Sequence, residues 1–88
     1  MKVLVLYRSH SDHGREVETY GAEFEHRCAG VKLELQDVDR REGAATASLY
    51  DITSYPAVLV LQDNGTASMV WQGQMLPLID EVAGYALA

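Results

Sequence analysis

The sequence has a single cysteine, Cys28, among its 88 residues. One thiol cannot form an internal disulfide, and small secreted domains usually carry several cysteines. The N-terminal segment has only a short apolar run and lacks the small-residue cleavage site of a signal peptide. We therefore expect a reducing, cytoplasmic location. We expect no membrane span, because no apolar run approaches about 20 residues.

Basic residues are also scarce. Seven lysines and arginines stand against thirteen acidic residues, which gives a formal net charge of −6. The basic residues are scattered, and the one adjacent pair, Arg40-Arg41, is flanked by Asp37, Asp39 and Glu42. Because a negative field repels phosphate backbones, we expect no nucleic-acid binding.

Internal boundaries are absent as well. The sequence has no repeat, linker or low-complexity segment, and 48% of its residues are hydrophobic. A chain of this length can bury one hydrophobic core. We therefore expect one domain over residues 1–88.

Four segments have the patterns of β-strands. Residues 3–7 and 57–61 are continuously apolar, which is typical of strands covered on both faces. Residues 31–38 alternate apolar and polar side chains, the pattern of a half-buried strand. Residues 66–71 follow Asn64-Gly65, a pair that favours a tight turn, so we expect them to pair antiparallel with the preceding strand.

The first predicted helix has a clear apolar face. Four residues recur at spacings of three and four: Val17, Tyr20, Phe24 and Cys28. We expect Asp12 or Ser11 to cap the start of this helix, and Gly30 to take a left-handed conformation at its end. Cys28 is then predicted to be a buried core thiol, since free cysteine is among the most buried residue types.

Two further helices complete the chain. Residues 40–50 are rich in alanine and predict a weaker second helix. Pro77 fits the first turn of a third helix, with an apolar face of Leu78, Ile79, Val82 and Ala86. The order β-α-β-α-β-β-α implies a parallel pair with a right-handed crossover and an added antiparallel strand. The predicted fold class is α/β, a four-stranded mixed sheet flanked by three helices.

This order resembles the core of thioredoxins and glutaredoxins, and particular residues strengthen the resemblance. Asp37-Val38-Asp39 resembles the acidic segment that ends a strand in the family. Tyr50-Asp51-Ile52 resembles the family's Tyr-Gly-Ile, and Ser54-Tyr55-Pro56 resembles its Ser-Ile-Pro. Asn64-Gly65 resembles the hairpin turn, and Gly73 the glycine after the last strand. The resemblance covers most of the chain and implies a thioredoxin-like fold.

The redox centre of that family is missing from the sequence. When the first strand is aligned, the two cysteine positions fall on Asp12 and Arg15, the preceding tryptophan on Ser11, and the buried acid of the first strand on Leu6. Disulfide exchange needs one thiolate to attack and a second thiol to resolve the intermediate. We therefore expect no dithiol–disulfide oxidoreductase activity, and we assign neither catalytic residues nor a cofactor.

The resemblance implies that the Tyr55–Pro56 bond is cis and that this proline faces the loop at the start of the first helix. The backbone of Tyr55 is then expected to point outward and to pair with an extended peptide as an added strand. Our main hypothesis is a non-redox module that binds a protein or peptide partner. Its candidate residues are Ser9, His10, Ser11, Asp12, His13, Gly14, Arg15, Tyr55, Pro56 and Gly73.

Other functions stay open at this point. The hydroxyls of Tyr7, Ser9 and Ser11 resemble those that some glutathione transferases use after the first strand, so a glutathione-like ligand or a thiol-dependent enzyme is an alternative. A second alternative is an auxiliary redox protein that uses Cys28 as a lone thiol. His10, Asp12 and His13 are metal-ligand types, but no further ligand is close in sequence, and we assign no metal. The oligomeric state also stays open, because an exposed last strand allows edge pairing.

Overall fold

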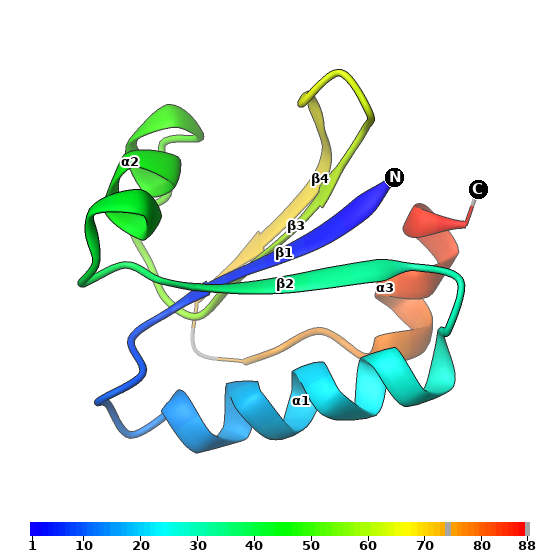
Figure 1. Ribbon diagram of the computed structural model, residues 1–88, viewed down its shortest axis with the longest axis horizontal. Coiled ribbons are helices and arrows are strands. Elements are labelled where there is room, and N and C mark those ends of the chain that lie inside the picture. The colour runs from blue at the N-terminus through cyan, green and yellow to red at the C-terminus, as the bar shows by residue number, and fades with distance from the viewer. Residues whose placement is uncertain (74, 88) are drawn as a thin grey trace.

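The computed structural model describes residues 1–73 and 75–87. Its elements follow in the order β1 (Lys2–Tyr7), α1 (Gly14–Arg27), β2 (Lys32–Asp37), α2 (Arg41–Leu49), β3 (Ala57–Leu61), β4 (Ala67–Gln72) and α3 (Ile79–Ala86). This order and the mixed four-stranded sheet confirm the prediction (Figure 1).

The register of the sheet brings the ends of several strands together. The strand order is β2-β1-β3-β4, with β1 parallel to β2 and antiparallel to β3, and β3 antiparallel to β4. Tyr7 pairs with Asp37, and Ala57 pairs with both Leu6 and Gln72. The ends of β1, β2 and β4 and the start of β3 therefore lie together at the same end of the sheet. The candidate site lies at this end.

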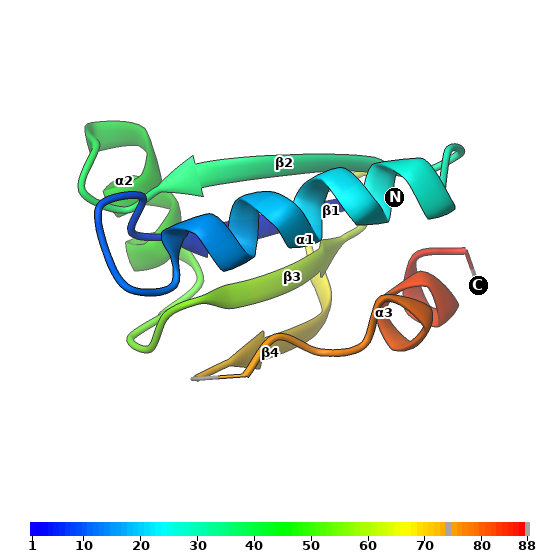
Figure 2. The ribbon, with the colours of Figure 1, turned by 90° about the horizontal axis from the view of Figure 1, so that it is seen from below.

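The helices cover both faces of the sheet. α1 and α3 lie on one face and α2 on the other (Figures 1 and 2). Alternate residues of β1 divide between the two cores: Val3 and Val5 pack on the α1 and α3 side, and Leu4 and Leu6 on the α2 side. All four are at most 2% exposed, so the strand is covered on both faces as its apolar run predicted.

The end of α1 differs from the sequence prediction. The helix stops at Arg27, and Cys28 is its C-cap, with its backbone N–H donating to the carbonyl of Phe24 at 2.8 Å. The chain then turns at once, since the N–H of Val31 donates to the carbonyl of Cys28. Cys28 is therefore half-buried against the core rather than inside the helix, and Gly30 does not adopt a positive φ.

Two helix starts also differ from the prediction. The N-cap of α1 is His13, and no side chain caps the helix; Ser11 instead donates its hydroxyl to the carbonyl of Arg8. α3 begins at Ile79, with Leu78 in an extended conformation as its N-cap, so Pro77 precedes the helix instead of starting it. Leu78 is consequently 75% exposed and does not join the apolar face of α3.

Candidate functional site

The segment before β3 turns sharply at the edge of the sheet. The Tyr55–Pro56 peptide bond is cis, the isomer that the resemblance implied. Gly73, directly after β4, lies beside it and donates its N–H to the carbonyl of Pro56 at 3.3 Å. Its φ of +135° belongs to the region that favours glycine, so a side chain here would strain the backbone.

The start of α1 lies against this turn. Asp12, His13 and Glu16 line a surface depression of about 320 Å³ together with Tyr55 and Pro56. The structure thus joins four of the predicted residues across more than 40 positions of sequence. Glu16 is an addition; its place in the first turn of the helix that follows the predicted loop is the signal that could have suggested it. We call this hollow the Tyr55–Pro56 depression.

Tyr55, which lines the depression, has backbone polar groups that are unpaired in the described part of the chain. Neither its N–H nor its C=O has a hydrogen-bond partner within residues 1–73 and 75–87. The two preceding amides are held, because Gln72 accepts from the N–H groups of Thr53 and Ser54 at 3.1 and 3.3 Å. Gln72 thereby fixes the chain just before the unpaired groups. This role of Gln72 was not predicted from the sequence, since only the β3–β4 register brings the residue here.

Arg8 was also missed, although it follows β1 directly. Its guanidinium lies 5.5 Å from the centre of the Tyr55 ring, a cation–π arrangement. The same group forms an ion pair with Asp39 after β2. Its backbone N–H donates to Nε2 of His13 at 3.1 Å. Arg8 therefore links the loop after β1 to the loop after β2 and to the turn that holds Tyr55.

The hydroxyls considered for an enzyme all donate to acceptors inside the protein. Tyr7 donates to Glu18 at 3.3 Å, and burial followed by the charge of Glu18 raises the pKa of the Tyr7 phenol. Ser11 donates to the carbonyl of Arg8 at 2.6 Å. Ser9 donates to the carboxylate of Asp37, and this bond, together with the N–H of Asp39, lowers the pKa of Asp37. These side chains hold the loop in place.

The other predicted residues do not line the depression. His10 and Arg15 are exposed on the loop and on the first turn of α1. Gly14 is buried, and a Cβ there would lie 2.3 Å from the carbonyl oxygen of Ser9. Gly14 thus allows α1 to start close to the preceding loop. Cys28 lies at the opposite end of α1 from the depression.

Within the described residues, no group of three or more His, Cys, Asp or Glu side chains could hold a metal ion. In the same part of the chain, no helix is both long and apolar enough to cross a membrane.

Comparisons with known proteins give the fold. No protein-family model and no curated protein matches the chain. Among solved structures, it is similar to thioredoxin 1 from Thermosipho africanus, with a TM-score of 0.70 and 14% identity over 97% of this chain and 89% of that one. It is also similar to thioredoxin O2 from Arabidopsis thaliana, with a TM-score of 0.72 and 11% identity over 94% of this chain and 69% of that one.

A third similar structure is the C-terminal domain of DsbD from Neisseria meningitidis, with a TM-score of 0.65 and 20% identity over 98% of this chain and 78% of that one. The chain is therefore a thioredoxin-fold protein. With one cysteine, it lacks the Cys-x-x-Cys motif.

Proposed function

We propose that the protein is a binding module that recognises an extended segment of a protein partner at the Tyr55–Pro56 depression without exchanging disulfides. The observation that carries this proposal is that the backbone N–H and C=O of Tyr55 have no partner among the described residues, beside a hollow that Tyr55 lines together with Asp12, His13 and Glu16. An extended peptide can satisfy both groups as an added strand.

The neighbouring contacts support binding because they hold the unpaired groups in position. Gln72 anchors the two amides before Tyr55, Gly73 bonds to Pro56, and Arg8 lies over the Tyr55 ring. A binding surface that is already ordered loses less conformational entropy when a partner docks. The internal bonds of Tyr7, Ser9 and Ser11 give no support to an enzyme that depends on a free hydroxyl.

The proposal is tested by selecting peptides from a random library displayed on phage. The binding site of the selected peptides is then mapped by changes in the amide chemical shifts of the protein. We expect the largest shifts at Tyr55 and Gly73. Asp12→Arg, which changes the charge and size of one wall of the depression, should weaken binding by about tenfold, or roughly 1.4 kcal/mol.

The matched control is Glu25→Arg. Glu25 is also an exposed acid, but it lies on α1 and is not among the residues that line the depression. Equal loss of affinity in both variants would contradict the proposal, because it would reflect overall charge alone. A library that yields no peptide above background would contradict it as well.

A further inference from the structure

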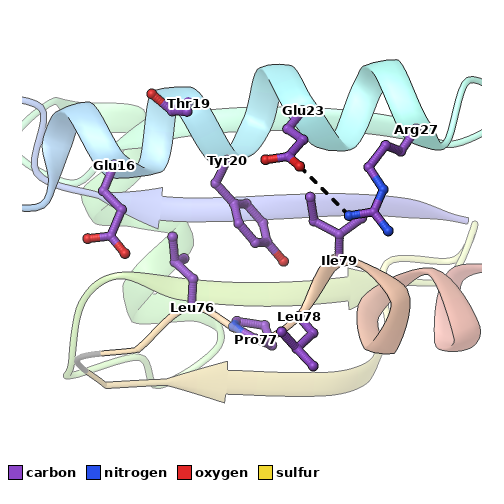
Figure 3. Close-up of a pocket in the computed structure, with 9 residues that line it drawn as sticks. All are labelled: Glu16, Thr19, Tyr20, Glu23, Arg27, Leu76, Pro77, Leu78 and Ile79. Carbon is purple, nitrogen blue, oxygen red and sulfur yellow. Dashed lines mark ion pairs between the residues drawn. The ribbon is translucent and has the colours of Figure 1, made fainter.

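A second hollow continues from the depression along α1. This groove, which we call the α1 groove, has a volume of about 480 Å³ and lies between α1 and the segment that leads into α3 (Figure 3). It is lined by Glu16, Thr19, Tyr20, Glu23, Arg27, Leu76, Pro77, Leu78 and Ile79. Glu16 lines both hollows, so the two meet at this residue.

The α1 groove joins an apolar side to an acidic side. Leu76, Pro77 and Leu78 form the apolar side, and Leu78 is 75% exposed. Glu16 and Glu23 come from α1 on the other side and border the groove (Figure 3). An exposed apolar surface bordered by charged side chains is typical of an interaction site.

Arg27, which lines the groove, already forms ion pairs with two acids. Arg27 lies 2.6 Å from a carboxylate oxygen of Asp80 and 3.8 Å from one of Glu23. Glu16 forms no ion pair with any described residue. The rim therefore keeps an excess of negative charge, in a protein whose net charge is −6. A second copy of the chain would bring the same negative charge, whereas a basic segment would be attracted.

Tyr20 lines the α1 groove from the side of α1. The Tyr20 ring points from α1 toward Pro77 and Leu78 (Figure 3). Its hydroxyl is buried and has no hydrogen-bond partner among the described residues. Because the protein itself covers that hydroxyl, the part of Tyr20 that a bound chain can contact is the ring.

We propose that the α1 groove extends the Tyr55–Pro56 depression and selects partner segments in which lysine or arginine lies next to apolar residues. This inference rests on the proposed function, because it assumes that the partner is docked at Tyr55. The stretch of α1 from Glu16 to Arg27 is about 16 Å long. An extended segment of about five residues spans that length.

The test uses two synthetic peptides of about ten residues with the same leucines and valines, one carrying lysines and the other glutamates at the remaining positions. We expect the lysine peptide to bind at least about tenfold more tightly at low salt. Its advantage should shrink in about 1 M NaCl, where charges are screened beyond ~3 Å. Binding should change the amide chemical shifts of Tyr55 and Gly73 at the depression, and also those of Thr19, Tyr20 and Leu76 along the groove.

Variants of the lining residues test the role of the charge. Glu16→Gln should weaken binding of the lysine peptide by about threefold or more, whereas the exposed Glu25→Gln on α1 should leave it unchanged. Tyr20→Phe removes only the covered hydroxyl and keeps the ring, so it should leave binding of the same peptide unchanged.

The outcomes distinguish the two proposals. Equal affinity of both peptides, with shifts at Tyr55 and Gly73 alone, would overturn the α1 groove and leave the proposed function standing. Shifts confined to the groove would overturn the proposed function and with it the continuous site. A concentration-dependent dimer in sedimentation whose interface covers Leu78 would overturn the inference in favour of a second copy.

Discussion

Two glycines within helices differ sharply in their surroundings. A Cβ on Gly43 in α2 would lie 2.1 Å from the carbonyl oxygen of Asp37, whereas a Cβ on Gly84 in α3 would meet nothing within 4 Å. Gly43→Ala must push α2 away from the end of β2 and should destabilise the protein by about 1–3 kcal/mol. Gly84→Ala should stabilise it by about 0.5–1 kcal/mol through helix propensity. Urea unfolding compares the two, and similar values would contradict this account of α2 packing.

Tyr20 and Tyr50 form a second contrasting pair. The Tyr20 hydroxyl is buried without a partner in the described residues, and burial, followed by the nearby Glu81 charge, raises the pKa of Tyr20 to about 12. Tyr20→Phe should therefore raise the free energy of unfolding by about 1 kcal/mol. The Tyr50 hydroxyl donates to the Gly65 carbonyl at 2.5 Å, so Tyr50→Phe should lower it by a similar amount. Thermal unfolding of both variants measures the difference; a destabilised Tyr20→Phe would mean that the hydroxyl has a partner.

At the scale of elements, a hydrogen bond from Ser9 to the carboxylate of Asp37 joins the loop after β1 to the end of β2. The hydrogen bond from Ser9 and the N–H of Asp39 lower the pKa of Asp37 below its ordinary value. A lowered carboxyl pKa in the folded state stabilises the protein at pH values above the unfolded pKa. That contribution is lost as the pH falls through the folded pKa, so stability should decline below about pH 4.

Ser9→Ala should raise the pKa of Asp37 and make the loss of stability at low pH less steep. The matched control is Ser68→Ala, because the Ser68 hydroxyl accepts a hydrogen bond from Gln62 on the exposed β3–β4 hairpin and touches no carboxylate there. Urea unfolding from neutral pH down to about pH 3 gives the stability curve, and a carbon-detected titration gives the pKa of Asp37. An unchanged pKa in Ser9→Ala would refute the role of this bond.

At the scale of the whole molecule, a thioredoxin fold with one cysteine should be silent in a dithiol assay. Cys28 lies at the far end of α1 from the Tyr55–Pro56 depression and has no second thiol in the chain. The purified protein should not accelerate the reduction of insulin by dithiothreitol above the buffer rate, because no resolving thiol is present. Cys28→Ala is the control; an activity present in both proteins would overturn this prediction.

The element order could be predicted from the sequence because hydrophobic periodicity is a local property. The apolar run of β3 gave its bounds, Ala57–Leu61, and Asn64-Gly65 gave the hairpin, where Gly65 has a φ of +88°. Helix ends were predicted less well. Cys28 fits the period of α1, yet the chain turns there to enter β2, and a period alone does not say where a helix stops.

The sequence by itself determined the fold class, the negative charge and the lack of a cysteine pair, since each follows from residue types and their spacing. Tertiary structure decided which residues meet: Arg8 with Tyr55, Gln72 with Ser54, and Glu16 with two hollows at once. The physical reason is that an apolar pattern tells which face of an element is buried but not which distant segment covers it. Contacts between segments far apart in sequence depend on the strand register and on how the helices pack across it.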